Sequence, residues 1–365
     1  MNIKAKLLFN NIAQWVIIGG FLFPLFGGIK GGFSQDIHFS QFYQTPLLIN
    51  PALTGAFNGE QRAIVNYKDQ WRSIDAPYQT YAFGVDMAMF KKKWENSYLG
   101  AGLFVFHDKA GEAAMKQTQV NLSLSSITAL SENHTISIGF QGGFAQRGVD
   151  AANQKWDTQY CPTCTDGHDP AAPSYEASNF NTFGFADFSA GAVWSFGTDE
   201  ANMISNDGFR ANAGVAYHHI NEPKQEFYNE EKLNPKIVAH GGLYVGMKNS
   251  NTAILPSIIY FQQGGAREIN AGMMIRYTVK EESRYTGIFK ETALQIGGYY
   301  RVGDAVIPAI VFEYGHWAVG VNYDFNISKL RAASNTRGGI EISLRYVNPN
   351  PFKYGKGTGS NVKFL

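Results

Sequence analysis

From Gln61 onward, apolar and polar residues alternate with a period of two, which is typical of β-strands whose two faces meet different surroundings. In the stretch Ile340–Tyr346, the apolar residues Ile340, Ile342, Leu344 and Tyr346 alternate with Glu341, Ser343 and Arg345. The stretches His316–Asn326 and Thr135–Gln141 show the same alternation. The polar face carries Ala, Gly and Ser beside its charges, and this mixture favours a crowded interior over open water.

This alternation predicts about fourteen strands, each near or above the ~9–11 residues that a tilted strand needs to cross a bilayer. The predicted strands are 61–70, 78–89, 98–108, 115–130, 134–149, 183–196, 208–219, 236–248, 252–261, 267–279, 292–301, 305–314, 316–326 and 338–346. The sequence therefore predicts an all-β fold, a transmembrane antiparallel β-barrel over residues 61–346. An even number of strands returns both ends of a bacterial barrel to the periplasm.

The lengths of the predicted connections largely agree with this topology. The long polar connections 150–182, 220–235 and 327–337 fall outside the cell, and the short ones 131–133, 249–251 and Gly315 fall in the periplasm. The mid-length connections 197–207 and 280–291 are periplasmic exceptions. Six aromatic residues are predicted at the periplasmic membrane interface, where Trp and Tyr are favoured; they are Trp94, Tyr98, Trp194, Tyr314, Trp317 and Tyr346.

The predicted inner face suggests a partly filled lumen. In 305–313 this face consists of Ala305, Ile307, Ala309, Val311 and Glu313, which is too apolar for a wide aqueous pore. The inward charges of Asp324, Glu341 and Arg345 are expected to pair inside the lumen, because an isolated charge there is costly. Pro256 and Pro308 lie within predicted strands and are expected to mark a bulge or bend.

The N-terminus has the features of a secretory signal peptide over residues 1–34. Lys4 and Lys6 precede a short apolar core, Trp15–Phe26, and small residues follow before Gln35. The apolar core is too short to span about 30 Å of hydrocarbon as a membrane anchor. We therefore expect the mature chain to begin near Gln35 and to lie in the outer membrane.

Composition and motifs exclude several functions. The 31 basic and 30 acidic residues nearly cancel, so no basic excess favours nucleic acid as a partner. The sequence contains no phosphate-binding loop, no G-x-S-x-G nucleophile elbow and no H-E-x-x-H motif. We expect no enzymatic activity and no cofactor.

The two cysteines, Cys161 and Cys164, form a Cys-x-x-Cys pair. A disulfide within an exported loop is the favoured interpretation, since the protein reaches an oxidising compartment. A metal-binding loop is the alternative, because Asp157, Asp166, His168 and Asp169 lie close by in the sequence. No second cysteine pair is present to complete a four-cysteine zinc site.

The segment before the first strand, residues 35–60, is apolar but is interrupted by Pro46 and Pro51. Its large side chains require burial; they are Phe39, Phe42, Tyr43, Leu47, Leu48 and Ile49. We hypothesise that this extended segment enters the periplasmic mouth of the barrel as a plug. A peripheral strap below the barrel is the alternative.

The predicted outer loop between the last two strands is basic. Lys329, Arg331 and Arg337 lie beside Ser334 and Asn335. Such a loop is suited to binding an acidic face of a secreted domain, and the alternative is a loop whose charges only keep it soluble. Residues 347–365 form a predicted periplasmic tail.

Long stretches of the chain resemble the PorP/SprF family of the type IX secretion system. The resemblance begins at QDIHFSQFYQTPLLINPALTGAFNG (35–59) and continues through YKDQWRSIDAPYQTYAFGVD (67–86). It is densest in ILPSIIY (254–260) and from DAVIPAIVFEY (304–314) to Tyr346. It covers nearly the whole mature chain, but the CPTC loop departs from the family pattern.

The resemblance implies an outer-membrane barrel that works with type IX secretion and gliding components. It also implies a secreted partner, whose C-terminal domain the barrel helps to export or to anchor at the cell surface. Other type IX components are implied on the periplasmic side. The alternative function is a diffusion channel or a transporter for hydrophobic substrates.

Overall fold

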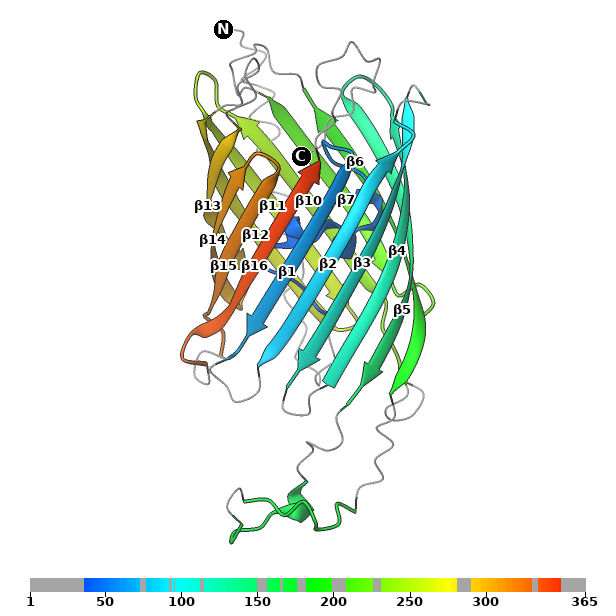
Figure 1. The fold of residues 1–365 in the computed structure, drawn as a ribbon, viewed down its shortest axis with the longest axis vertical. Helices are drawn as coiled ribbons and strands as arrows, with labels where there is room; N and C mark the ends of the chain where they lie inside the picture. The colour runs from blue at the N-terminus through cyan, green and yellow to red at the C-terminus, as the bar shows by residue number, and fades with distance from the viewer. Residues whose placement is uncertain are drawn as a thin grey trace. The chain divides into compact units, whose positions relative to one another are not determined.

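The computed structural model describes residues 36–72, 77–91, 94, 96–111, 115–149, 156–164, 167–175, 182–198, 208–225, 231–280, 290–329 and 334–348. Fourteen of the strands in these residues form one closed antiparallel sheet (Figure 1). This confirms the predicted transmembrane barrel. The described residues contain no helix with the length and apolar character needed to span a bilayer. The predicted signal peptide and the C-terminal tail from residue 349 lie outside the described residues.

The strands follow one another around the barrel in chain order, and β1 pairs with β16 to close it. The barrel strands are β1 Gln61–Gln70, β2 Tyr78–Met89, β3 Ser97–Ala110, β4 Met115–Ala129, β5 His134–Gly148, β6 Phe183–Gly197, β7 Phe209–His218, β10 Lys236–Gly246, β11 Thr252–Gln263, β12 Ala266–Lys280, β13 Thr292–Arg301, β14 Ala305–Tyr314, β15 Trp317–Asn326 and β16 Arg337–Asn348. A separate two-stranded ribbon is formed by β8 Lys224–Gln225 and β9 Glu231–Lys232.

The two ends of the barrel differ in their connections. We call the end that carries the connections 149–182, 219–235 and 327–336 the loop end, and the opposite end the turn end. In bacterial barrels the short turns and both termini of the sheet lie in the periplasm. The loop end of this barrel therefore faces the outside of the cell.

The two faces of the sheet have opposite character. On β4, Leu122 and Leu124 point outward and are more than 60% exposed, whereas Ser123 and Ser125 point inward and are buried. An apolar outer face matches lipid, and a polar inner face matches a hydrated or hydrogen-bonded interior. The two-residue period of the sequence therefore separates a membrane-facing surface from a lumen.

The inward charges pair inside the lumen, as expected. Asp324 contacts Arg301 at 2.9 Å, and Arg345 contacts Glu313 at 3.1 Å. Glu341 lies 3.4 Å from Lys68, which is its cross-strand neighbour on β1. The Lys68–Glu341 pair thus crosses the seam at which the barrel closes.

The two in-strand prolines do not create bulges, which were one of the two outcomes predicted for them. The pairing of β10 with β11 is interrupted beside Pro256, and that of β14 with β15 beside Pro308, but the register is the same on both sides of each interruption. Proline lacks an N–H group, so it removes a ladder bond without requiring an extra residue. A register shift occurs instead between Thr278 and Lys280 on β12.

Tyr98 also differs from its predicted position at the membrane interface. Its side chain is fully buried, and its hydroxyl donates to the Gly55 carbonyl at 3.3 Å. Tyr98 points inward because of its place in the β3 alternation. Trp194, Tyr314 and Trp317 point outward as predicted and are between 39% and 51% exposed.

Candidate functional site in the lumen

The described residues before β1, from Asp36 onward, lie inside the barrel (Figure 1). They form three short helices, η1 Phe42–Gln44, α2 Pro46–Ile49 and η2 Pro51–Leu53. Pro46 and Pro51 begin the second and third helices, where the missing N–H of proline costs nothing. The Asn50 side chain caps η2 by accepting from the Ala52 N–H at 2.9 Å. The prolines therefore divide this segment into helical turns. This differs from the prediction that the segment is extended.

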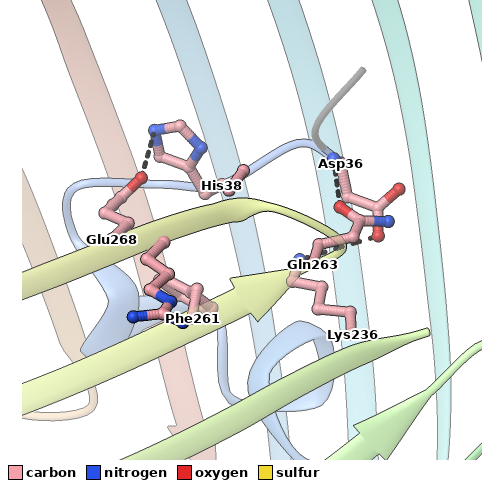
Figure 2. A pocket seen from close by; sticks show the side chains of 8 residues that line it. Asp36, His38, Lys236, Phe261, Gln263 and Glu268 are labelled. Carbon is pink, nitrogen blue, oxygen red and sulfur yellow. Dashed lines mark hydrogen bonds and ion pairs between the residues drawn. The ribbon is translucent and has the colours of Figure 1, made fainter. Parts of the chain in front are cut away.

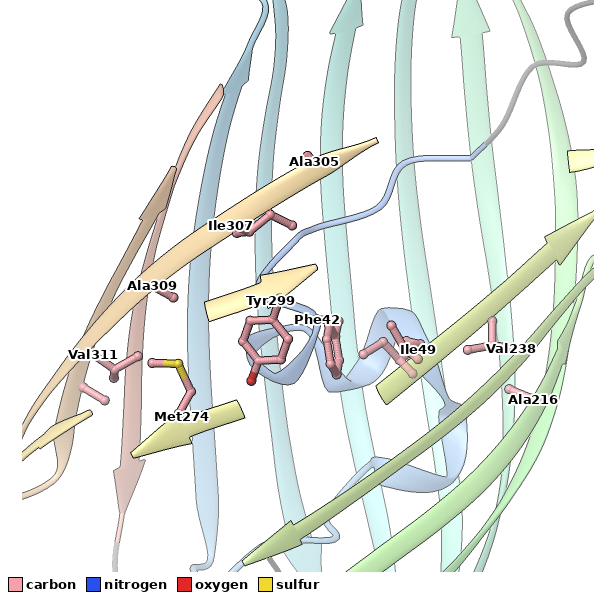
Figure 3. Close-up of a cluster of buried hydrophobic side chains, with 12 residues drawn as sticks. Phe42, Ile49, Ala216, Val238, Met274, Tyr299, Ala305, Ile307, Ala309 and Val311 are labelled. Atoms are coloured by element: carbon pink, nitrogen blue, oxygen red, sulfur yellow. The ribbon is translucent and has the colours of Figure 1, made fainter. Parts of the chain in front are cut away.

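The apolar side chains of the segment pack against two regions of the wall. Phe42 and Ile49 belong to a buried cluster with Tyr299 and Ile307 (Figure 3). Phe39 and Leu47 belong to a second cluster with residues of β2 and β3. Tyr43 and Leu48 are partly buried beside these clusters. Burial of each large side chain contributes about 1.5–3 kcal/mol.

Polar side chains of β15 and β16 bind the backbone of the segment. The two carboxylate oxygens of Glu341 accept from the backbone N–H groups of Ser40 and Gln41, at 2.8 and 3.0 Å. The Gln41 side chain donates to Asn322 at 2.6 Å and accepts from Ser343 at 2.7 Å. Sequence analysis did not single out Gln41, although the polar inward positions of these strands pointed to an inner partner.

At the loop end, Asp36 lies in a cluster of charges. Its carboxylate is 2.5 Å from His219 and 3.7 Å from Lys236. The backbone N–H of Asp36 donates to the Gln263 side chain at 3.0 Å (Figure 2). On its other side, the His219 ring contacts Asp187 at 2.9 Å. The segment therefore starts at the loop end of the lumen.

These contacts change the proton affinities of both groups. Burial alone would lower the pKa of His219, but the carboxylates of Asp36 and Asp187 raise it to about 9. Burial alone would raise the pKa of Asp36, but His219 and Lys236 hold it well below its ordinary value. The pair is therefore ionic at neutral pH. The sequence placed His219 at the end of a strand but did not identify Asp36 as its partner.

Toward the turn end, the carbonyls of the segment accept bonds from the wall. Ser137 Oγ donates to Ala52 O at 2.6 Å, and Gln141 Nε2 donates to Leu47 O at 3.1 Å. The Gly55 N–H donates to Asp86 at 2.8 Å. Bonds from β2 and β5, together with those from β15 and β16, hold the segment on several sides.

Glycines of the wall mark where the segment approaches most closely. A Cβ atom at Gly139 would lie 2.3 Å from the Pro51 carbonyl carbon, and one at Gly100 would lie 2.2 Å from the Thr54 oxygen. Real side chains do not fit at these distances, so the two glycines make room for the backbone of the segment. Such inward glycines are the signal in the sequence for a backbone that packs closely against the wall.

A small pocket opens between the start of the segment and β10–β12 at the loop end. It is lined by Asp36, His38, Lys236, Phe261, Gln263, Ala266, Arg267 and Glu268 (Figure 2). His38 contacts Glu268 at 3.5 Å there. No group of three or more metal-ligating side chains suited to a metal ion occurs in the part of the chain that the structure describes.

The basic outer loop has both exposed and buried members. Lys329, Asn335 and Arg337 are exposed. Ser334 is fully buried and accepts from the Asn326 side chain at 3.1 Å, so it holds the base of the loop. Arg331 lies outside the described residues. Within the described part of the loop, Lys329 and Arg337 are the charges open to a partner.

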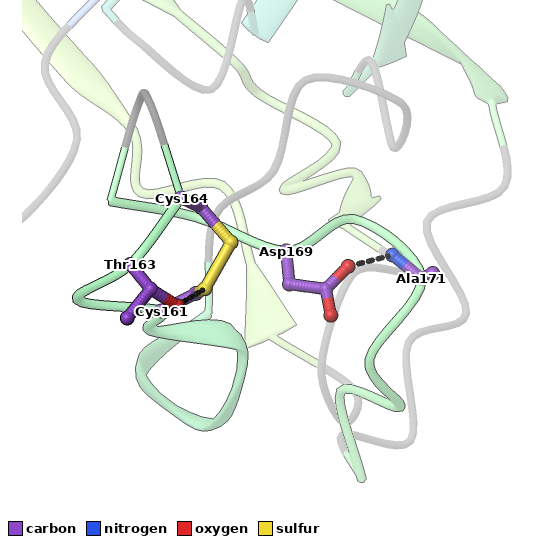
Figure 4. The surroundings of a disulfide bond; sticks show 5 residues. All are labelled: Cys161, Thr163, Cys164, Asp169 and Ala171. Carbon is purple, nitrogen blue, oxygen red and sulfur yellow. Dashed lines mark hydrogen bonds between the residues drawn. A yellow bond between two sulfur atoms is a disulfide. The ribbon is translucent and has the colours of Figure 1, made fainter.

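The two cysteines are joined to each other. Cys161 and Cys164 form a disulfide with a Cα–Cα distance of 5.4 Å (Figure 4). The nearby Asp169 accepts from the backbone N–H of Ala171 at 2.9 Å. Asp166 lies outside the described residues.

A closed antiparallel barrel with an apolar outer face and a polar inner face defines an outer-membrane β-barrel protein. Residues 31–346 match the family described as type IX secretion system membrane protein PorP/SprF. The chain belongs to this family and is a secretion-related protein of the outer membrane. No curated protein matches the sequence.

Several solved barrels are similar to this chain. The P. putida toluene transporter TodX has a TM-score of 0.45 and 10% identity, over 84% of this chain and 94% of that one. A Pseudomonas aeruginosa FadL homologue has a TM-score of 0.45 and 11% identity, with coverages of 81% and 92%. The translocator domain of the autotransporter NalP from Neisseria meningitidis has a TM-score of 0.37 and 12% identity, with coverages of 79% and 88%.

Proposed function

We propose that this protein is an accessory barrel of type IX secretion that binds the C-terminal domain of a secreted protein, for export or for anchoring at the cell surface. The observation that carries this proposal is the occupied lumen, in which residues 36–58 pack against the wall and bond to it. We infer that this segment acts as a plug. A barrel occupied by its own chain acts through the surfaces at its two ends, because its interior offers no free passage.

The outer surface that suits this role is the basic loop between β15 and β16. Lys329 and Arg337 are exposed there, and Ser334 anchors the base of the loop. Exposed positive charges accelerate and orient the approach of an acidic surface. We assign the C-terminal domain of the secreted protein to the loop end of the barrel and other type IX components to the turn end.

The test is in-cell crosslinking of the barrel combined with its deletion. We expect crosslinking to recover a secreted protein with a type IX C-terminal domain, and we expect deletion to remove that protein from the cell surface. Reversing two loop charges, with Lys329→Glu and Arg337→Glu, should lower the amount of the secreted protein that is retained at the cell surface. Lys109→Glu, an exposed lysine at the loop end of β3, is the matched control.

Two results would contradict the proposal. One is normal export and surface retention of every type IX cargo in cells without the barrel. The other is loss of solute uptake as the main defect, which would favour a diffusion channel or a transporter for hydrophobic substrates.

A further inference from the structure

The outer connection between β5 and β6 contains an element that the proposed function leaves unexplained. In residues 156–175, the Asp169 N–H donates to Gln159 O at 2.9 Å and the Cys161 N–H donates to Gly167 O at 3.0 Å. Figure 4 shows the Cys161–Cys164 disulfide, which, together with these bonds, joins residues of the element to one another. Joining two neighbouring strands requires only a few residues. We call the described residues of this element, 156–164 and 167–175, the disulfide knob.

The disulfide knob presents two tyrosines to solvent. Tyr160 is 71% exposed and Tyr175 is 85% exposed. The outward aromatics of the strands face lipid, but these two belong to an extramembrane connection. Tyrosine is among the residues that dominate binding energy at protein interfaces, so two exposed tyrosines on one extramembrane element are candidate contacts for a partner.

The backbone at Tyr175 supports the same interpretation. Its φ is +54°, in the left-handed region, where a residue with a Cβ costs roughly 1–2 kcal/mol. Glycine or asparagine would adopt this conformation at lower cost. The Tyr175 side chain is 85% exposed, so its ring adds little packing among the described residues and is available for binding.

The charge of the knob indicates the kind of partner. Residues 156–175 include Asp157, Asp166 and Asp169, and they contain no lysine or arginine. A negative surface attracts a positive one, and tyrosine rings favour contact with arginine or lysine cations. Tyrosines set among carboxylates are therefore suited to a basic protein surface.

We propose that the disulfide knob docks a basic face of the secreted protein, with arginine or lysine side chains packing on Tyr160 and Tyr175. This inference rests on the proposed function and identifies a second contact, separate from the basic loop. The disulfide and the internal bonds order the knob before binding, so less conformational entropy is lost when the partner binds.

The test uses the full-length barrel and the secreted protein that in-cell crosslinking recovers. The variant combines Tyr160→Ala with Tyr175→Asn; asparagine tolerates the left-handed backbone, so a loss of binding reports the missing ring. We expect binding at least about tenfold weaker, and wild-type binding that weakens as salt is raised. Tyr160→Phe with Tyr175→Phe keeps both rings and should retain binding.

Equal affinity of the Ala/Asn variant and the wild type would overturn the inference. So would salt-independent binding, or photocrosslinking from position 175 to a second copy of this chain instead of the secreted protein. Failure of the proposed function is distinguishable, because export would then persist without the whole barrel. If the cargo is lost with the whole barrel but kept by the knob variant, only the knob inference fails.

Discussion

At the scale of single residues, Glu341 links three parts of the molecule. It is 2% exposed, accepts the backbone N–H groups of Ser40 and Gln41, and pairs with Lys68 at 3.4 Å. Lys68 lies on β1 and Glu341 on β16. One carboxylate therefore connects the N-terminal segment to the closing seam.

Replacing Glu341 with Gln should destabilise the barrel. The variant leaves the Lys68 ammonium without its carboxylate and provides only one acceptor oxygen for two N–H groups. Breaking a buried ion pair costs about 3–5 kcal/mol of stability. Urea unfolding of the barrel in lipid vesicles would measure this decrease in the free energy of unfolding. Glu132→Gln removes the same charge from an exposed position in the connection between β4 and β5 and is the control. A loss no larger than that of the control would contradict this role of Glu341.

The ion pair of Asp36 with His219 predicts a pH window for docking of the segment. The pKa of His219 rises from 6.5 to about 9, so its stabilisation is complete below pH 6.5 and is lost as pH rises through 9. The pKa of Asp36 is depressed below 3.8, so its stabilisation is present above pH 3.8 and is lost as pH falls through the folded value. Both contributions are complete between pH 3.8 and 6.5.

Hydrogen exchange of residues 36–41, corrected for the intrinsic effect of pH, would measure this window. We expect the protection of these amides to fall between pH 6.5 and 9.5. His219→Gln removes the titrating group and should give a weaker but flat profile over that range. A sloping profile in this variant would assign the pH dependence to another group.

At the scale of elements, the three short helices η1, α2 and η2 act as one unit inside the sheet. Their backbone accepts bonds from Ser137 and Gln141 and approaches Gly100 and Gly139 too closely for any Cβ. Part of the wall around them is lined with polar side chains, including Asn121, Ser123 and Ser125 on β4, beside the apolar regions on which the segment packs. The polar part of the wall can be hydrated when the segment is absent.

Deletion of residues 36–58 should therefore convert the filled barrel into a conducting one. The strands pair with one another through backbone bonds that do not involve the segment, so we expect the sheet to close without it. Conductance in planar bilayers should rise well above that of the full-length barrel. Unchanged conductance from a variant that retains its β-sheet circular dichroism would contradict the plug role of the segment.

At the scale of the whole molecule, the barrel and the disulfide knob are built by different interactions. The barrel depends on strand pairing around a closed ring. The knob depends on short-range bonds such as those of Gln159 with Asp169 and Ala172, and on its disulfide. Interactions that share no partners contribute independently to stability.

Removing the disulfide should leave the barrel intact. The double variant Cys161→Ser with Cys164→Ser is expected to unfold within about 0.5 kcal/mol of the wild type, as for independent sites. The measurement is urea unfolding monitored by β-sheet circular dichroism in vesicles. Proteolysis within residues 156–175 should increase in the same variant. A lower barrel stability would show that the knob supports the sheet.

The barrel could be predicted from local sequence patterns. Side chains along a strand alternate between two faces. Ile342 and Ser343 therefore indicate a membrane side and a lumen side, even when the neighbouring strands are not known. The predicted bounds of β1, β2, β13 and β14 equal the observed ones. The bounds of a strand can be predicted from the sequence because turn residues and the alternation of side chains are properties of neighbouring residues in the chain.

The contents of the lumen depend on contacts between residues that are far apart in the chain. Asp36 and His219 are far apart in the chain, as are Gln41 and Ser343, and no local pattern pairs them. Tyr98 was misplaced for the same reason: a tyrosine at a strand end suits either face, and the Gly55 carbonyl that it binds comes from the inner segment. Alternation tells which residues point inward, but their partners depend on how the sheet closes around residues 36–58.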